Sequence, residues 1–208
     1  MKSYLNFFGF ALLVVMIGCK EKTQSIPVCE NSRFYYYYNE KQYLKEEVKK
    51  ATISFSDTIS IDTIHDIFQS FLKIQYSSTD IEKAKWMSVT INANTCAEVD
   101  NIFSKLLTDK RVTACNRDML APKDYDMGVT DIIMCKLIND SLTFRLNELN
   151  TSTNSSIYRY DSTGKYYLIR VHKNAKMDAI DLANKYYESG YFIFSQPDFI
   201  LHNVLLVN

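Results

Sequence analysis

The feature that most constrains the fold is a pattern that recurs after 80 residues, from Lys85 to Lys165. Each copy predicts a strand, a helix and a second strand, and the copies align without a gap. The expected elements are 85–91, 96–107 and 111–115 in the first copy and 165–171, 177–188 and 191–195 in the second. Apolar residues in both helices follow the spacing of one buried helix face. The pattern favours an internal duplication over a chance alignment of two unrelated segments.

A further strand, helix and short strand are expected before each copy. They span 52–55, 61–73 and 74–77 in the first half and 131–137, 141–149 and 156–160 in the second. Each half then has the order β-α-β-β-α-β, which is the ferredoxin-like arrangement of a small antiparallel sheet with two helices on one face. The predicted fold class is therefore α+β, with two tandem ferredoxin-like units. A hairpin of 34–38 and 42–44 is expected to pair with the first sheet.

The start of the chain has the pattern of an exported, lipid-anchored protein. A short basic start leads into the apolar run Tyr4–Ile17, and Gly18-Cys19 follows in a context that resembles a bacterial lipobox. Cleavage there would make Cys19 the lipidation site. The alternative is an uncleaved membrane helix, which needs about 20 apolar residues. We expect a lipid anchor at the bacterial outer membrane or cell surface, with the periplasmic side as the other location.

These features predict four segments along the chain. They are a signal peptide (1–18), a flexible tether (19–33), a first unit with its hairpin (34–121) and a second unit with a C-terminal tail (122–208). The boundary is placed near Pro122, because proline, aspartates and glycine mark residues 121–128 as a turn-rich connector.

Composition excludes several classes of function. The 24 Lys and Arg residues equal the 24 Asp and Glu residues, so no excess positive charge attracts nucleic acid. Four cysteines of the mature chain allow three disulfide pairings, and buried free thiols are the alternative: Cys29, Cys96, Cys115 and Cys135. No two cysteines have metal-ligand spacing, and the three histidines lie far apart: His65, His172 and His202. We therefore expect no metal site and no cofactor.

Two stretches resemble the propeptides of secreted subtilisin-like (S8) serine proteases of Bacteroidetes-type bacteria. The aromatic run and polar turn of 34–44 resemble the start of those propeptides, and 179–192 and 195–199 resemble their last helix, strand and closing Pro-Asp. Gln196 replaces the usual acidic residue of that closing motif. The resemblance implies a ferredoxin-like inhibitor or folding chaperone with its C-terminal tail in the protease cleft. The implied cleft residues are Pro197, Asp198, Phe199, Ile200, Leu201 and His202.

The glycine-rich motifs that carry the catalytic residues of such proteases do not occur in this sequence, so no enzymatic activity is expected. The expected function is inhibition or folding of a subtilisin-like protease in trans, and the expected partners are that protease and a membrane. One alternative is a surface lipoprotein that binds a peptide, a glycan or an envelope partner, and another is a truncated protease remnant. Tyr35–Tyr38 could form a carbohydrate-stacking platform, although strand packing is favoured because alternate rings face opposite sides.

Overall fold

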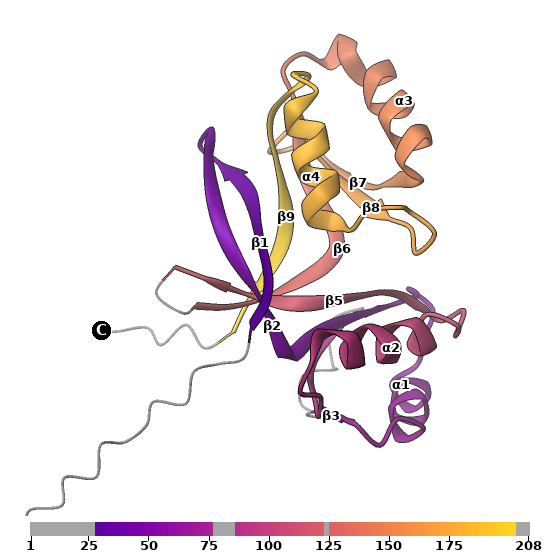
Figure 1. The fold of residues 1–208 in the computed structure, drawn as a ribbon. Helices are drawn as coiled ribbons and strands as arrows, with labels where there is room; N and C mark the ends of the chain where they lie inside the picture. The colour runs from indigo at the N-terminus through magenta and orange to yellow at the C-terminus, as the bar shows by residue number, and fades with distance from the viewer. Residues whose placement is uncertain (1–27, 77–85, 123–124, 203–208) are drawn as a thin grey trace, which may run out of the picture.

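The computed structural model describes residues 28–76, 86–122 and 125–202. Strands and helices follow one another in two successive runs (Figure 1). The first run comprises β1 (Val28–Tyr37), β2 (Glu40–Phe55), α1 (Ile61–Gln69), β3 (Ile74–Tyr76), β4 (Trp86–Ile91), α2 (Cys96–Leu106) and β5 (Val112–Ala121). The second comprises β6 (Tyr125–Leu137), a 3₁₀ turn (Asp140–Leu142), α3 (Thr143–Thr153), β7 (Ser155–Asp161), β8 (Tyr166–Val171), α4 (Ala179–Glu188) and β9 (Phe192–Leu201).

The strands form one curled antiparallel sheet in the order β3-β4-β2-β5-β6-β8-β7, with β1 added to β2 and β9 added to β6. Strands account for 48% of the structure, which makes the protein mostly β. The predicted fold class, α+β with two tandem ferredoxin-like units, is therefore wrong. The halves share one sheet because β5 and β6 pair as a hairpin, with Met119 opposite Met127. The predicted boundary at Pro122 thus falls in the turn of that hairpin.

Two long strands explain why two small separate sheets do not form. β2 has 16 residues and β6 has 13, whereas the sequence predicted only segments of them. The sequence predicted two separate strands here, 42–44 and 52–55, with the charged stretch 45–50 between them. β2 runs through this stretch because Glu46 is buried and paired with Arg33 and Arg117. Each long strand therefore reaches partners at both of its ends and connects parts of the sheet that shorter strands would leave apart.

The four predicted helices are confirmed within the described residues. α1 and α2 lie beside the strands of the first half, and α3 and α4 lie beside those of the second (Figure 1). Ser60, Thr95 and Asp178 each accept a hydrogen bond from a backbone N–H in the first turn of α1, α2 and α4. Such N-caps satisfy donors that the helix itself leaves open. The predicted β-α-β-β-α-β order of elements also occurs in both halves.

The buried apolar side chains form two clusters that meet along β2. Ile53 and Phe55, near the end of β2, pack into the cluster under α1 and α2. Leu44, near its start, packs into the cluster that contains Ile133 and Tyr186. The turn end of the β1–β2 hairpin therefore packs with the second half, although it precedes the first half in sequence.

One disulfide settles a pairing that the sequence left open. Cys29 at the start of β1 is bonded to Cys96 at the start of α2, with an S–S distance of 2.03 Å. Cys115 and Cys135 are free thiols. Burial raises the pKa of the Cys135 thiol, so this side chain behaves as a small apolar group.

Within the described residues, none of the helices has the length and apolar character needed to cross a membrane. The predicted signal peptide and the lipidation site at Cys19 lie outside the described residues.

Candidate functional site

The predicted cleft residues lie in β9, where they pair with the protein's own sheet. Pro197 stands opposite Ile133, and Leu201 stands opposite Met127. The backbone N–H of His202 then donates to the carbonyl of Asp126 at 3.0 Å. The backbone groups of β9 that face β6 are thus already used in an internal antiparallel ladder and are not free to pair with a protease. Residues 203–208 of the predicted tail lie outside the described residues.

The tyrosine run 35–38 divides into two packed rings and two exposed rings. Tyr35 packs edge-on against Phe199 with ring centroids 5.0 Å apart. Tyr36 stacks on Tyr187 of α4 at 4.3 Å. The expectation of strand packing is therefore met by the first two rings. Tyr37 and Tyr38, by contrast, are 46% and 82% exposed.

The turn between β1 and β2 holds Tyr38 in an unfavourable backbone conformation. Tyr37 pairs with Glu40, so the connecting loop consists of Tyr38 and Asn39 alone. Their φ angles are 46° and 67°, which is the pattern of a type I′ turn. Asparagine tolerates this left-handed region, but for a bulky residue such as tyrosine it costs about 1–2 kcal/mol. Asn-Gly would satisfy the same turn without that cost.

A pocket opens beside this turn. The hairpin of β1 and β2 stands next to β9 and α4 (Figure 1). Its volume is about 450 Å³, within the usual range for small-molecule sites. The lining residues are Tyr36, Tyr37, Tyr38, Asn39, Met134, Tyr187, Ile193, Phe194 and Gln196. We call this site the tyrosine pocket. Among these described lining residues, none carries a charge at neutral pH, and two carry amides.

Hydrogen bonds position the tyrosine pocket's polar groups. The hydroxyl of Tyr187 donates to Oδ1 of Asn39 at 2.5 Å, which fixes that amide at the rim. The hydroxyl of Tyr36 donates to Glu188 at 2.9 Å. Desolvation and this carboxylate raise the pKa of Tyr36, and a hydrogen bond with Tyr38 raises the pKa of Tyr37. Both phenols therefore remain neutral hydrogen-bonding groups throughout the physiological pH range.

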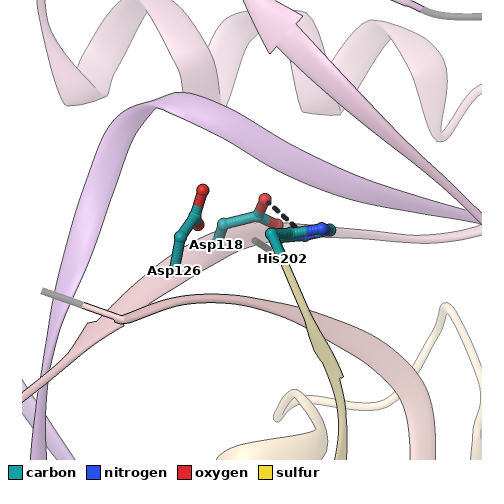
Figure 2. Close-up of side chains that lie close together, drawn as sticks. All are labelled: Asp118, Asp126 and His202. Atoms are coloured by element: carbon teal, nitrogen blue, oxygen red, sulfur yellow. Dashed lines mark ion pairs between the residues drawn. The ribbon is translucent and has the colours of Figure 1, made fainter. Parts of the chain in front are cut away.

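A second constellation lies at the other end of β9. Asp118 of β5, Asp126 of β6 and His202 after β9 each offer one ligand atom, and these atoms lie within 4.8 Å of one another (Figure 2). Nε2 of His202 is 3.3 Å from Oδ2 of Asp118. The hydroxyl of Thr52 donates to Oδ1 of Asp118 at 2.7 Å. We call Asp118, Asp126 and His202 the carboxylate–histidine cluster.

Further charges surround the cluster in the sheet. Lys50 forms an ion pair with Oδ2 of Asp126. Glu47 is buried beside them, and its desolvation, reinforced by the charge of Asp126, raises the pKa of its carboxyl to about 7. Burial likewise raises the pKa of Asp118, which is fully buried. Glu47 and Asp118 therefore lie in an environment that disfavours the negative charge of their carboxyl groups.

Sequence reasoning missed this cluster and expected no metal-ligating group. Its members come from positions 118, 126 and 202: the β5–β6 hairpin brings Asp118 near Asp126, and the pairing of β6 with β9 brings His202 to both. The only local signal was the presence of acidic residues inside strands that are otherwise buried. That signal shows that the side chains need partners but does not identify them.

Comparisons with known protein families, with curated proteins and with solved structures found no match. The resemblance to subtilase propeptides therefore stays a prediction.

Proposed function

We propose that this protein is a non-enzymatic binding protein, tethered to the bacterial envelope through Cys19, whose tyrosine pocket binds a neutral carbohydrate. This is one of the alternatives that the sequence left open. The observation that carries the proposal is Tyr38, whose ring is 82% exposed at the pocket while its backbone has a φ of 46°.

Neither property of Tyr38 benefits the folded state. The left-handed backbone opposes folding, and the exposed ring gains little from burial. Strained, exposed residues of this kind concentrate at binding sites, where the strain holds a side chain in position. Tyr37 supports the ring, because their centroids lie 4.5 Å apart at an interplanar angle of 73°. The pair therefore presents an exposed aromatic surface at the pocket before any ligand arrives.

The lining favours an uncharged, hydroxyl-rich ligand. Aromatic faces pack against the C–H surfaces of a sugar, and the amides of Asn39 and Gln196 can exchange hydrogen bonds with its hydroxyls. A charged ligand would lose its hydration here without gaining a counter-charge from the lining residues.

The test is a binding screen of the chain that lacks residues 1–19 against neutral oligosaccharides, acidic oligosaccharides and short peptides. We expect neutral oligosaccharides to bind and Tyr37→Ala to weaken that binding by about tenfold or more, as removal of an aromatic anchor does. Tyr43→Ala is the matched control, because Tyr43 is an exposed tyrosine of the same hairpin that does not line the pocket. Binding of peptides alone, or equal loss in both variants, would reject the proposal.

The expected inhibitor function is kept as a second candidate in a narrower form. Because β6 holds 197–201, only the following residues of the tail could reach a protease cleft, and they include the apolar run 204–207. The assay is inhibition of a subtilisin-like protease by the chain with and without residues 203–208. Inhibition that disappears with these six residues would support this candidate, and equal inhibition or none would reject it.

A further inference from the structure

The carboxylate–histidine cluster contains buried oxygen atoms with no hydrogen-bond donor. Oδ1 of Asp126 and Oε2 of Glu47 are both inaccessible to solvent and have no hydrogen-bond partner within the described part of the chain. Glu47 is 4% exposed and Asp126 is 8% exposed. A buried carboxylate oxygen without a partner is costly, so such atoms call for an explanation. A cation bound by Asp126 together with Asp118 and His202 is one explanation for the Asp126 oxygen that the surrounding residues support.

The local charge leaves room for such a cation. Glu47, Asp118 and Asp126 supply three carboxyl groups, whereas Lys50 is the cation that pairs with this cluster, through Asp126. His202 can add a positive charge only if it is protonated. A divalent ion at this point would stabilise the ionised carboxylates, as Lys50 does for Asp126.

Each aspartate is held by one oxygen and offers the other. Thr52 donates to Oδ1 of Asp118, and Oδ2 of the same residue faces His202. Lys50 binds Oδ2 of Asp126, and Oδ1 is the atom without a partner. Outer partners that orient ligand side chains in this way are typical of metal sites.

The backbone at Gly128 packs closely against the imidazole of His202. A Cβ atom built on Gly128 would lie 2.9 Å from Nε2 of His202 and 2.4 Å from Oγ1 of Thr52. Any other residue at this position of β6 would therefore displace both the histidine and the outer partner of Asp118. Ser88 approaches the same Nε2 at 3.2 Å, so its hydroxyl also contacts the face where a metal would bind.

From this geometry we propose that Asp118, Asp126 and His202 bind one divalent transition-metal ion. One imidazole nitrogen with carboxylate oxygens suits zinc or manganese, whereas calcium and magnesium prefer oxygen ligands alone. The 3.3 Å between Nε2 of His202 and Oδ2 of Asp118 equals the separation of two ligands on a tetrahedral zinc, about 3.3 Å for bonds of about 2.0 Å. The ion would join β5, β6 and the end of β9 at one point.

The test is titration of Zn²⁺, Mn²⁺ and Ca²⁺ into untagged, metal-stripped chain 20–208 by calorimetry, with thermal unfolding as a second readout. We expect Zn²⁺ to bind one ion per chain and to raise the midpoint of unfolding, with EDTA reversing the rise. His202→Gln should abolish the binding and the rise together. Thr52→Val removes only an outer partner and should weaken Zn²⁺ binding by about 10–100-fold.

His65→Gln is the matched control, because His65 lies on α1 and is hydrogen-bonded to Tyr76 at 2.8 Å. It should leave Zn²⁺ binding unchanged. Should His202→Gln fail to fold, Gly128→Ala provides a second variant that blocks the same space, with circular dichroism as the check of folding. Absence of saturable Zn²⁺ binding by the wild-type chain, or binding that His202→Gln leaves unchanged, would overturn the proposal.

Discussion

The tyrosine pocket and the carboxylate–histidine cluster use opposite ends of the same strand, β9, and differ in almost every physical respect. The pocket is open, uncharged and lined by aromatic rings. It lowers the stability of the fold through the strained backbone of Tyr38. The cluster is buried and charged. It lowers the stability of the fold through the desolvation of carboxylates such as Asp118. One strand pair, β6 with β9, thus positions two sites suited to different ligands.

The difference teaches where each site obtains its rigidity. The pocket depends on a two-residue turn and on contacts between the hairpin and α4, including Tyr36 with Tyr187. The cluster depends on the β5–β6 hairpin and on His202 after β9, which is distant in sequence and reaches Asp118 only in the folded sheet (Figure 2). Substitutions in the hairpin turn or α4 should therefore affect the tyrosine pocket and spare the cluster, and substitutions in the strands around the cluster should do the reverse.

The largest expected effect comes from removing the disulfide, which should destabilise both regions but the cluster more. Cys29 lies beside Val28, which pairs with Glu47, so the bond holds the end of the hairpin nearest the cluster. Replacing both Cys29 and Cys96 with serine should lower the free energy of unfolding by about 2–5 kcal/mol. Urea denaturation measures this loss, and an unchanged midpoint would show that the bond does not stabilise the fold.

A smaller effect, confined to the cluster, is expected from Thr52→Val. This change leaves Oδ1 of the buried Asp118 without its donor and should cost about 1–3 kcal/mol. Thr90→Val on β4 is the matched control, because Thr90 is exposed and should change stability by less than about 0.5 kcal/mol. Equal losses in the two variants would mean that the cluster is no more sensitive than the surface.

Tyr187→Phe should lower the free energy of unfolding by a still smaller amount, and its effect on ligand binding should be confined to the pocket. The ring that stacks on Tyr36 remains, but the 2.5 Å hydrogen bond to Asn39 is lost. Stability should fall by about 0.5–1.5 kcal/mol at most, while oligosaccharide binding weakens because the rim amide is no longer held. Zn²⁺ titration of the same variant should match the wild type, and a change there would contradict the separation of the two sites.

No effect at all is expected from pH on ligand binding at the pocket. The raised pKa values of Tyr36 and Tyr37 keep these phenols protonated beyond their usual titration near pH 10.0, so neither changes charge at lower pH. The oligosaccharide dissociation constant should stay flat between about pH 5 and 8. A systematic trend across that range, measured by calorimetry, would show that a titrating group contributes to binding.

The contrast between the regions also explains what could be predicted from the sequence. Helices such as α2 and the hairpin turn near Asn39 depend on local spacing and capping, and they occur where expected. The fold class was wrong because β2 continues through Lys45–Lys50, where the buried Glu46 pairs with Arg117 and Lys50 pairs with Asp126, both distant in sequence. The aromatic run drew attention to the pocket, but Tyr187, Ile193 and other lining residues lay outside that pattern.

The carboxylate–histidine cluster could not be predicted from local sequence patterns, because its contacts also join residues distant in sequence. His202 was singled out as a tail residue, yet its partner Asp118 lies 84 positions earlier and reaches it only through the folded sheet. Periodicity predicts which face of a strand is buried, whereas register decides which buried polar groups meet.

The most direct test of the proposed function is to measure stability and oligosaccharide binding of Tyr38→Gly in parallel. Glycine relieves the left-handed strain at a φ of 46°, so the free energy of unfolding should rise by up to about 1 kcal/mol. Binding should nevertheless fall by about tenfold or more. Lys165→Gly, at a φ of 53° in the turn before β8, should raise stability similarly and leave binding intact. Unchanged binding in Tyr38→Gly would contradict the account.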